Sequence, residues 1–423
     1  MQYLLSIVIP TRNRQKYALA AVKQIYNVTD ERVQIVISDN SDDDSLQKNI
    51  SAHKFSGRVK YKYIPERIPG VDNYINGITM SDGEYLCNIG DDDGIMRYIA
   101  DVVEWAKRND IEAITPLLSC QYFWPGVFED YKDGKMIMSG VEKEYYKLKS
   151  PQEGLIEIIK SGGVNYYHQE VAKMYHAVVK KECFDKVKQI SGSYCGGLVP
   201  DVYLSTAFSL VVKEVLFLGI PLTIPGICPE SESGRTANKK DHGKLKDFTY
   251  WCGQDYTWSK KVPFFYSSST IWADSLMHAL EDMGAYDMAD LFSLKDFTID
   301  CMRLYPKYKK ELLKFYYENT GSHLEDYEPN KASRNKSIAE ELKVILIKTG
   351  AKLPEPMKRF IKKMLRMKTT MPSEQFGLNN HPDAEDIIKA EELVYNFVKE
   401  DVDVYLKRMK NGEFGLESSN GLG

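Results

Sequence analysis

Three consecutive carboxylates, Asp91, Asp92 and Asp93, follow directly on the apolar segment 85–89. Adjacent carboxylates repel one another unless a cation offsets their charge. A divalent metal held between them and a phosphate would do this, and oxygen ligands of this kind suit Mg²⁺ or Mn²⁺. The alternative is a solvated acidic turn at the start of the next helix. The first chemistry that the sequence indicates is therefore metal-assisted binding of a phosphorylated ligand.

Polar side chains also follow two earlier apolar segments. Pro10, Thr11 and Arg12 come after segment 4–9, and Asp39 and Ser41 come after segment 33–37. An arginine can offset phosphate charge, and an aspartate can accept a hydrogen bond from a base or a ribose. Together these groups suit a nucleotide.

The elements that must position these groups alternate between strand and helix. Short β-branched segments at 4–9, 33–37 and 85–89 are typical of buried strands, and apolar residues at helical spacing fill 18–28. This alternation predicts an α/β fold with a mainly parallel, doubly wound, Rossmann-like sheet. Ligands of such sheets bind beyond the carboxyl ends of the strands, so we expect the polar loops to share one crevice.

The whole chain divides into a sheet-bearing part, 1–250, and a mostly helical part, 251–423. In the first part we expect a strand at 59–64, a helix opening at 70–79, a helix at 99–108, strands at 111–115 and 174–179, and a helix from 200 to about 210. Residues 121–150 lack a clear period and are interpreted as an insertion. In the second part helical spacing predicts helices at 271–283, 288–296, 308–317, 338–347 and 384–409.

Composition and missing motifs exclude several classes of protein. The 423 residues include 56 Lys and Arg against 60 Asp and Glu, and this balance argues against nucleic acid as a partner. Seven cysteines without a C-x-x-C pair indicate neither a zinc ribbon nor a disulfide framework. The sequence has no G-x-x-x-x-G-K-[ST], G-x-G-x-x-G, H-E-x-x-H or G-x-S-x-G motif, which disfavours kinases, dinucleotide enzymes, zinc proteases and serine hydrolases of those types.

Four strings in this order, S-I-V-I-P-T-R-N-R, V-I-S-D-N-S-D-D-D-S, P-G-V-D-N-Y-I-N-G and N-I-G-D-D-D-G, resemble the family 2 glycosyltransferases of the GT-A fold, of the kind that builds bacterial cell-surface polysaccharide. The resemblance covers about residues 4–100, becomes loose to about residue 245 and does not extend into the helical part. It implies an inverting transferase that moves a sugar from a nucleoside diphosphate sugar, with UDP as the expected carrier, to a hydroxyl of a glycan or lipid-linked acceptor.

The resemblance also implies roles for particular residues. The D-x-D motif of the family matches Asp91 and Asp93, the first facing the ribose and the last binding Mn²⁺ or Mg²⁺, and Asp92 could take either role. The nucleotide-sugar-binding set that it implies is Pro10, Thr11, Arg12, Asp39, Ser41, Arg67, Asn73, Asp91 and Asp92. Arg67 has the alternative of being a plain surface residue.

The family places its catalytic base about a hundred residues after the metal motif, at the start of a helix, and Asp201 matches that place. Pro200 precedes it, whereas the family often has an acidic pair there. A helix N-cap is the alternative role of Asp201. A carboxylate at a helix amino terminus tends towards a lowered pKa, so a base role would require burial to offset this.

Two further groups are open to more than one interpretation. The polar segment 230–242 matches a loop that closes over the diphosphate in such enzymes, with His242 as an additional metal ligand, or is a plain polar loop. His168 and His176 are interpreted as satisfied core or surface residues. The aromatic residues Tyr122, Phe123, Trp124, Tyr166 and Tyr167 either stack on an acceptor sugar or fill the core.

Segment 331–368 carries twelve basic and three acidic residues, and its piece 357–367 has the pattern of an amphipathic helix. It either holds the protein at an anionic membrane surface or forms a solvated face. No stretch approaches the roughly 20 apolar residues that span a bilayer. We therefore expect a cytoplasmic protein, peripheral at the inner face of the cell membrane, with homo-oligomer formation through the carboxyl-terminal helices as a further expectation. A catalytically degenerate carbohydrate-binding or scaffold module is the alternative to an enzyme.

Overall fold

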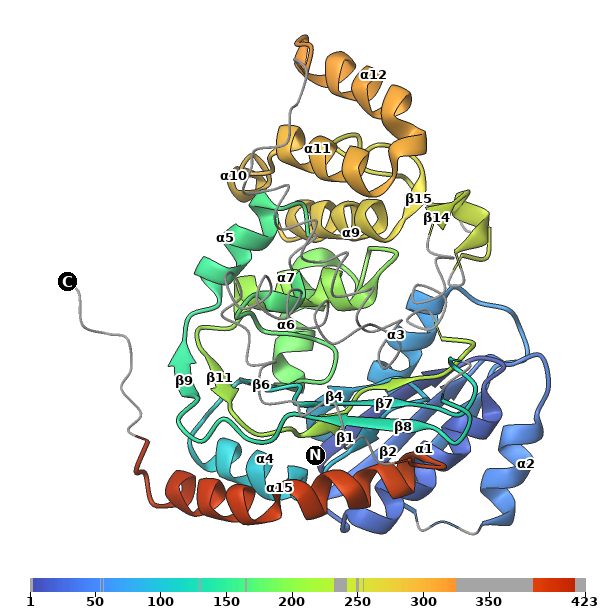
Figure 1. The fold of residues 1–423 in the computed structure, drawn as a ribbon, viewed down its shortest axis with the longest axis vertical. Coiled ribbons are helices and arrows are strands. Elements are labelled where there is room, and N and C mark those ends of the chain that lie inside the picture. Colours follow the sequence, from blue (N-terminus) through green and yellow to red (C-terminus); the bar gives the residue numbers. More distant parts are fainter. Residues whose placement is uncertain are drawn as a thin grey trace, which may run out of the picture.

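The computed structural model describes residues 3–53, 55, 57–128, 131–163, 166–231, 242–248, 251–253, 255–324 and 383–414. Its centre is an eight-stranded sheet (Figure 1). The strands are, in spatial order, β3 (Val59–Tyr63), β2 (Val33–Asp39), β1 (Tyr3–Thr11), β4 (Gly83–Asn88), β10 (Val178–Lys180), β6 (Ala113–Pro116), β11 (Val215–Leu218) and β9 (Tyr146–Lys149). Only β10 and β9 run antiparallel to their neighbours in this sheet. The predicted mainly parallel α/β sheet is confirmed.

Helices cover both faces of the sheet, so the central strands are buried along most of their length. One face packs against α1 (Gln15–Val28), α4 (Ile99–Arg108) and the last described helix, α15 (Ile387–Lys410). The other packs against α3 (Gly70–Met80), α6 (Lys181–Ser191) and α7 (Pro200–Val211). This arrangement explains why β1 and β2 read as continuous apolar segments rather than as alternating ones.

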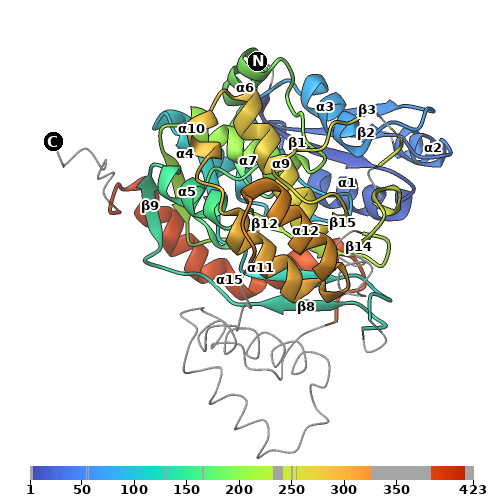
Figure 2. The same cartoon turned by 90° about the horizontal axis from the view of Figure 1, so that it is seen from above.

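A second helical layer lies on α7. It consists of α5 (Gln152–Lys160), α9 (Ser268–Asp282), α10 (Tyr286–Ala289), α11 (Leu294–Leu304) and α12 (Lys309–Thr320). Figure 2, seen from above, shows α11 and α12 in front of α9 and the sheet. Ser267 begins α9 with a capping box, in which its side chain accepts from the Thr270 amide and the Thr270 side chain accepts from the Ser267 amide. The predicted helical character of this part is confirmed for its described residues.

Two expectations about elements were wrong. Segment 121–150 is not a separate insertion, because β7 (Cys120–Phe123) and β8 (Lys135–Met138) form a small sheet with β13 (Gly226–Ile227), and β9 completes the main sheet. The single helix expected at 288–296 is divided between α10 and α11. The reason is a capping residue inside the segment: the Ser293 side chain accepts from the Asp296 amide and starts a new helix there.

The carboxyl-terminal helix α15 packs against the sheet-bearing part rather than standing apart. The buried Glu391 side chain forms a two-pronged ion pair with Arg97, with distances of 2.9 and 2.7 Å. The basic segment 331–368 and the helix expected at 338–347 lie outside the described residues. None of the described helices is both long and apolar enough to cross a membrane. The domain boundary near residue 250, the oligomeric state and the membrane contact stay predictions.

Candidate active site

A large pocket of about 1300 Å³ lies where the loops after β1 and β4 meet the amino end of α7 and the second helical layer. Of the residues selected from the sequence, the pocket lining includes Pro10, Thr11, Arg12, Arg67, Asn73, Asp92, Asp93 and Asp201. Asp39, Ser41 and Asp91 are buried and do not line it. His242 begins β14 (His242–Gly243), and its side chain lies outside the described ones. The shared crevice expected from the strand ends is therefore present.

The acidic loop after β4 is fixed by backbone amides, two of them from the distant segment 226–228. Asp93 accepts through Oδ1 from the Gly226 amide at 2.6 Å and through Oδ2 from the Gly90 amide at 2.5 Å. Asp92 Oδ2 accepts from the Cys228 amide at 2.9 Å. Gly226 must be glycine here, because a Cβ would lie 1.8 Å from the Asp92 carbonyl oxygen. The segment 226–228 thus holds two carboxylates at the pocket surface.

Asp91 lies behind this surface. Its Oδ2 accepts from Thr11 Oγ1 at 2.5 Å and lies 3.0 Å from Arg14 Nε, whereas its Oδ1 is buried and has no hydrogen-bond partner among the described residues. The same arginine lies 3.9 Å from Asp92 Oδ1. Arg14 was not selected from the sequence, although it stands in the same loop as Arg12.

The electrostatics of the acidic loop favour an added cation. Burial, with repulsion from Asp92, raises the pKa of both Asp91 and Asp93 well above the ordinary range of a carboxyl. Arg14 opposes this rise at Asp91, and the amides of Gly226 and Gly90 oppose it at Asp93. The Arg14 guanidinium lies next to Asp91 and Asp92 and offsets one charge, so the loop keeps an excess of negative charge when all three carboxylates are ionised.

The residues present fit a divalent cation in their chemistry. Asp92 and Asp93 bring carboxylate oxygens to the pocket, and Mg²⁺ and Mn²⁺ prefer such ligands. Among the described residues no three His, Cys, Asp or Glu side chains are grouped as a metal site. Two aspartates would therefore hold a cation only together with ligands from outside the chain, as Mg²⁺ is usually held by one or two carboxylates and substrate phosphates.

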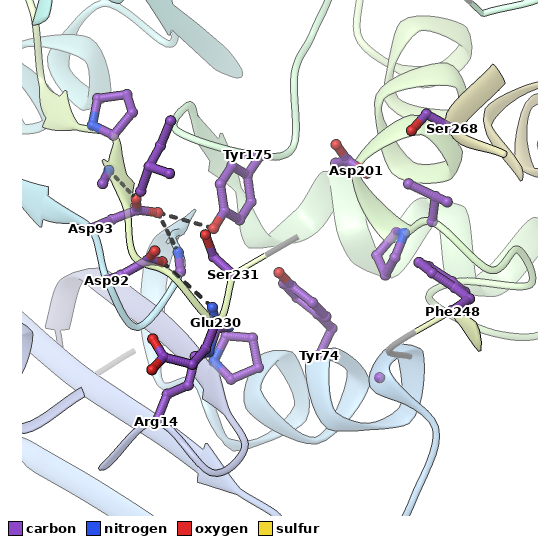
Figure 3. Close-up of a pocket in the computed structure, with 18 of the residues that line it drawn as sticks. Arg14, Tyr74, Asp92, Asp93, Tyr175, Asp201, Glu230, Ser231, Phe248 and Ser268 are labelled. Carbon is purple, nitrogen blue, oxygen red and sulfur yellow. Dashed lines mark hydrogen bonds and ion pairs between the residues drawn. The ribbon is translucent and has the colours of Figure 1, made fainter. Parts of the chain in front are cut away.

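Tyr175 and His176 complete the surroundings of Asp93. The Tyr175 hydroxyl donates to Asp93 Oδ2 at 3.0 Å, and His176 Nε2 lies 3.5 Å from the same oxygen (Figure 3). His176 has a φ of +61° and is buried, and burial, with Lys173 nearby, lowers its pKa to about 3. The imidazole is therefore neutral. No sequence signal joins these residues to Asp93, because they lie more than 80 positions later.

The loops after β1 and β2 are tied together beside the acidic loop. The Asn13 amide donates to Ser41 Oγ at 2.8 Å, and Arg12 Nη2 lies 3.0 Å from Asp42 Oδ1. Asp39 accepts from the Ser41 amide and from the Tyr61 hydroxyl, at 2.9 and 2.6 Å. The Asp39 carboxylate therefore shapes the loop from within.

Asn40, next to Asp39, is the residue that reaches the pocket lining. Asn73 links the two loops to α3 by donating to the Thr11 carbonyl and to the Asn40 side-chain oxygen, both at 3.1 Å. Arg67 lines the pocket and donates to the Trp251 carbonyl at 3.2 Å. The side chains of Arg12, Asn40 and Arg67 thus share one end of the pocket with the acidic loop.

Asp201 lies at the second position of α7 and faces the pocket from the other side. Figure 3 shows Asp201 and Ser268 apart from Asp92 and Asp93, with Tyr175 between them in this view. Asp201 is half-buried. This partial burial raises the pKa of its carboxyl to about 6, although the amides of Val202 and of Asp201 itself act to lower it. The loss of solvation therefore outweighs the effect of the helix amino terminus on this pKa.

The aromatic residues that the sequence offered as a sugar-stacking group lie in or against the core, as far as their side chains are described. Tyr122, Trp124 and Tyr166 are buried, and Phe123 packs partly buried against the same core as Tyr122. The side chain of Tyr167 lies outside the described ones. His168 is exposed in a short 3₁₀ turn, Tyr166–His168. None of the described members of this aromatic group lines the pocket.

Comparisons with known proteins agree with the sheet and its loops. The family described as Glycosyl transferase family 2 matches residues 6–173. A Campylobacter jejuni protein named GalNAc(5)-diNAcBac-PP-undecaprenol beta-1,3-glucosyltransferase is 33% identical over 94 residues, which are 22% of this chain and 30% of that protein. The match thus spans less than a third of that relative.

Two solved structures of S. aureus TarS are similar at 10% identity. One covers 77% of this chain and 57% of its own, with a TM-score of 0.41. The other, TarS 1–349 in complex with UDP-GlcNAc, covers 93% of this chain and 91% of its own, with a TM-score of 0.39. The family match over residues 6–173 includes β1, β2, β4 and the acidic loop, so this part of the chain is similar to the family 2 glycosyltransferases.

Proposed function

We propose that this protein is an inverting glycosyltransferase that moves a sugar from a nucleoside diphosphate sugar, with UDP as the expected carrier, to a hydroxyl of a glycan or lipid-linked acceptor. The observation that carries the proposal is one pocket with carboxylates at two separate places. Asp92 and Asp93 lie at one side, held by backbone amides of segment 226–228, and Asp201 lies at the other, at the start of α7.

The end of the pocket with Arg12, Arg67 and Asn40 would bind the nucleotide. Guanidinium groups offset phosphate charge, and the amide of Asn40 can hydrogen-bond a base or a ribose. Asp92 and Asp93 would hold Mn²⁺ or Mg²⁺ between themselves and the diphosphate. When bound, the cation supplies electrostatic stabilisation of the diphosphate that leaves. Tyr175 and the amides of Gly90 and Gly226 fix the Asp93 carboxylate in place for this role.

Asp201 would act as the general base. Its carboxylate takes the proton of the acceptor hydroxyl as the hydroxyl oxygen bonds to the anomeric carbon, and the bond from that carbon to the diphosphate breaks. Attack from the side opposite the leaving group inverts the anomeric centre. The placement of Asp201 across the pocket from Asp92 and Asp93 supports this division of roles.

The acceptor and the cellular location are proposed from the relative. Its name describes a lipid-linked glycan as the substrate of that protein. We propose an acceptor of the same class, used in cell-surface polysaccharide synthesis at the cytoplasmic face of the membrane. The basic segment 331–368 would then provide the contact with anionic lipid.

Activity is expected to fall as the pH drops through the pKa of Asp201. A base accepts a proton only when ionised, so the plateau lies above pH 6, and at pH 5 kcat/KM should be about tenfold below it. The measurement is a pH profile of UDP release at saturating Mn²⁺, with UDP affinity measured at each pH as the control. A profile that is flat from pH 5 to pH 7 would contradict the role of Asp201.

The proposal as a whole is tested by thermal melting with a panel of sugar nucleotides, with and without Mn²⁺. A ligand that binds the folded state at about 100 times its Kd adds about 2.7 kcal/mol, which corresponds to about 3 °C for a chain of this length. We expect a Mn²⁺-dependent shift and slow release of UDP from the same donor. Shifts without any sugar release would favour the degenerate binding module, and no shift with any nucleotide in a folded protein would reject the proposal.

A further inference from the structure

The carboxylate of Asp201, the proposed base, has no side-chain partner. Among the described residues no side chain hydrogen-bonds it, and it is reached by the backbone amides of Asp201 and Val202. The helix α7 also begins without a side-chain cap, because its N-cap residue is Val199 and its first residue is Pro200. The direction of the Asp201 carboxylate therefore depends on how the backbone at 199–202 is held.

Ser275 of the neighbouring helix α9 holds that backbone. The Val199 amide donates to Ser275 Oγ at 3.0 Å, and Ser275 is buried. The Val199 carbonyl accepts from the Tyr203 amide at 3.1 Å, which closes the first turn of α7. In Figure 1 α9 lies along α7. The Ser275 hydroxyl thus fixes the residue at which α7 starts, two positions before Asp201.

Two glycines let the chain before α7 approach α9 closely enough for this hydrogen bond. Gly196 faces the Asp282 side chain, and Gly197 faces Ser275. A Cβ at Gly197 would lie 2.9 Å from the Ser275 Cβ, which is closer than two such carbon atoms pack. Neither glycine has a positive φ, so the close approach and not the backbone conformation requires them. The contact between Ser275 and this segment is therefore tight.

Asp274, next to Ser275 on α9, holds the preceding residue of the same segment. Its buried carboxylate accepts from the Tyr256 hydroxyl at 2.5 Å and from the Ser259 amide at 2.8 Å. The Leu198 amide donates to the same Tyr256 hydroxyl. Together with the amide that Ser275 accepts, two consecutive residues before α7 are tied to α9 and to the chain that leads into it.

We propose that Ser275 is a positioning residue for the sugar transfer, because its hydroxyl fixes the start of α7 and thereby aims the Asp201 carboxylate at the acceptor hydroxyl. This inference rests on the proposed function and deepens it, since it assigns the placement of the base to a helix outside residues 6–173, the span of the family match. The alternative is that Ser275 only stabilises the packing of α7 on α9. The two differ in whether losing the hydroxyl acts through Asp201.

Ser275→Ala is expected to lower kcat about 10- to 100-fold at unchanged UDP affinity. A reacting group displaced by about 1 Å can cost about 100-fold in rate, and Ser275 does not line the pocket, so the nucleotide contacts stay. Ser209→Ala is the matched control, because Ser209 is also buried and its hydroxyl donates within α7, to the Ser205 carbonyl at 2.7 Å. Its kcat should stay within twofold of the unaltered protein.

A double-mutant cycle with Asp201→Asn separates positioning from packing. Once the base is removed, no carboxylate is left to misplace, so Ser275→Ala should lower the residual rate of Asp201→Asn less than twofold. Single-turnover rates of sugar transfer with Mn²⁺ are measured for the four proteins, together with melting temperature and UDP affinity. An equal fold-loss in both backgrounds would overturn the inference, and so would a kcat of Ser275→Ala within twofold of the unaltered protein.

Ser275→Cys is the second variant of the cycle. The thiol is close in size to the hydroxyl and is a weaker acceptor, so its kcat should lie between those of the unaltered protein and Ser275→Ala. It replaces Ser275→Ala in the cycle if that variant melts below the assay temperature. A kcat of Ser275→Cys below that of a folded Ser275→Ala would contradict the role of the hydrogen bond.

The same proteins separate this inference from the proposed function. If Asp201→Asn loses activity and Ser275→Ala keeps it, the inference fails and the proposed function stands. If Asp201→Asn transfers sugar at the full rate, Asp201 is not the base, and the inference fails with that assignment. If the unaltered protein transfers no sugar from any donor, the proposed function fails and the inference fails with it.

Discussion

Replacing Asp201 with asparagine is expected to lower kcat about 10²- to 10⁴-fold while leaving the affinity for UDP and Mn²⁺ unchanged. The amide has nearly the shape of the carboxylate, and it keeps an oxygen that can accept from the amides at the start of α7. It has no basicity with which to take the acceptor proton. Because Asp201 lies across the pocket from Asp92 and Asp93, its loss should affect the chemical step and not the nucleotide.

Asp72→Asn is the matched control for this variant. Asp72 also lies in the first turn of a pocket-side helix, α3, and burial also raises its pKa, but its side chain does not line the pocket. Single-turnover rates of sugar transfer, with melting temperature and UDP affinity for both variants, separate chemistry from folding. A fall of kcat in Asp72→Asn equal to that in Asp201→Asn would show that the effect is structural, and unchanged kcat in Asp201→Asn would exclude it as the base.

The part of the site that sequence could predict is the part that parallel strands bring together. The loops after β1 and β4 adjoin because these strands pair in register, with Val8 opposite Asn88. The two loops therefore lie at the same edge of the sheet, where Arg12, Asp92 and Asp93 line the pocket. The strands β1 and β2 could be predicted from the sequence, because continuous β-branched segments are typical of strands covered on both faces.

Local spacing could not predict which member of each loop faces the pocket. Asp39 and Asn40 are neighbours, but Asp39 points inwards to Tyr61 and the Ser41 amide, and Asn40 lines the pocket. In the acidic loop, Asp91 points back to Thr11 and Arg14. The direction of each side chain is decided by partners from other elements, which a single sequence does not show.

Contacts between distant segments were also invisible. Tyr175 and the Gly226 amide reach Asp93 from 82 and 133 positions away. Pocket-lining residues of the second helical layer, such as Trp272 and Tyr305, lie beyond the resemblance, where the sequence indicated only helices. Tyr122 lies in β7 and Trp124 directly follows that strand, and both are buried in the core by segments distant in the sequence.

The second large effect is expected on the UDP affinity of Asp93→Asn. The direction of this effect depends on whether Mn²⁺ is present. In the unaltered protein, Mn²⁺ should tighten UDP binding at least about tenfold, because the carboxylate excess of the acidic loop otherwise repels the diphosphate. In Asp93→Asn one of the charges that hold the cation is absent. Added Mn²⁺ should then change UDP affinity little, and sugar transfer should fall with it. Calorimetric titration of UDP into both proteins, with Mn²⁺ and with a chelator, measures this.

The chelator arm makes the test specific to charge. Without metal, Asp93→Asn removes a repulsive carboxylate from the pocket, so it should bind UDP no more weakly than the unaltered protein does under the same conditions. A variant that was merely misfolded would bind UDP more weakly in both arms. Asp44→Ala, at an acid outside the pocket whose side chain is 45% exposed, should behave as the unaltered protein throughout. If Asp93→Asn kept the full Mn²⁺ effect, or if Mn²⁺ had no effect on the unaltered protein, the acidic loop would not be the metal site, and the raised pKa of its carboxyls would reflect burial alone.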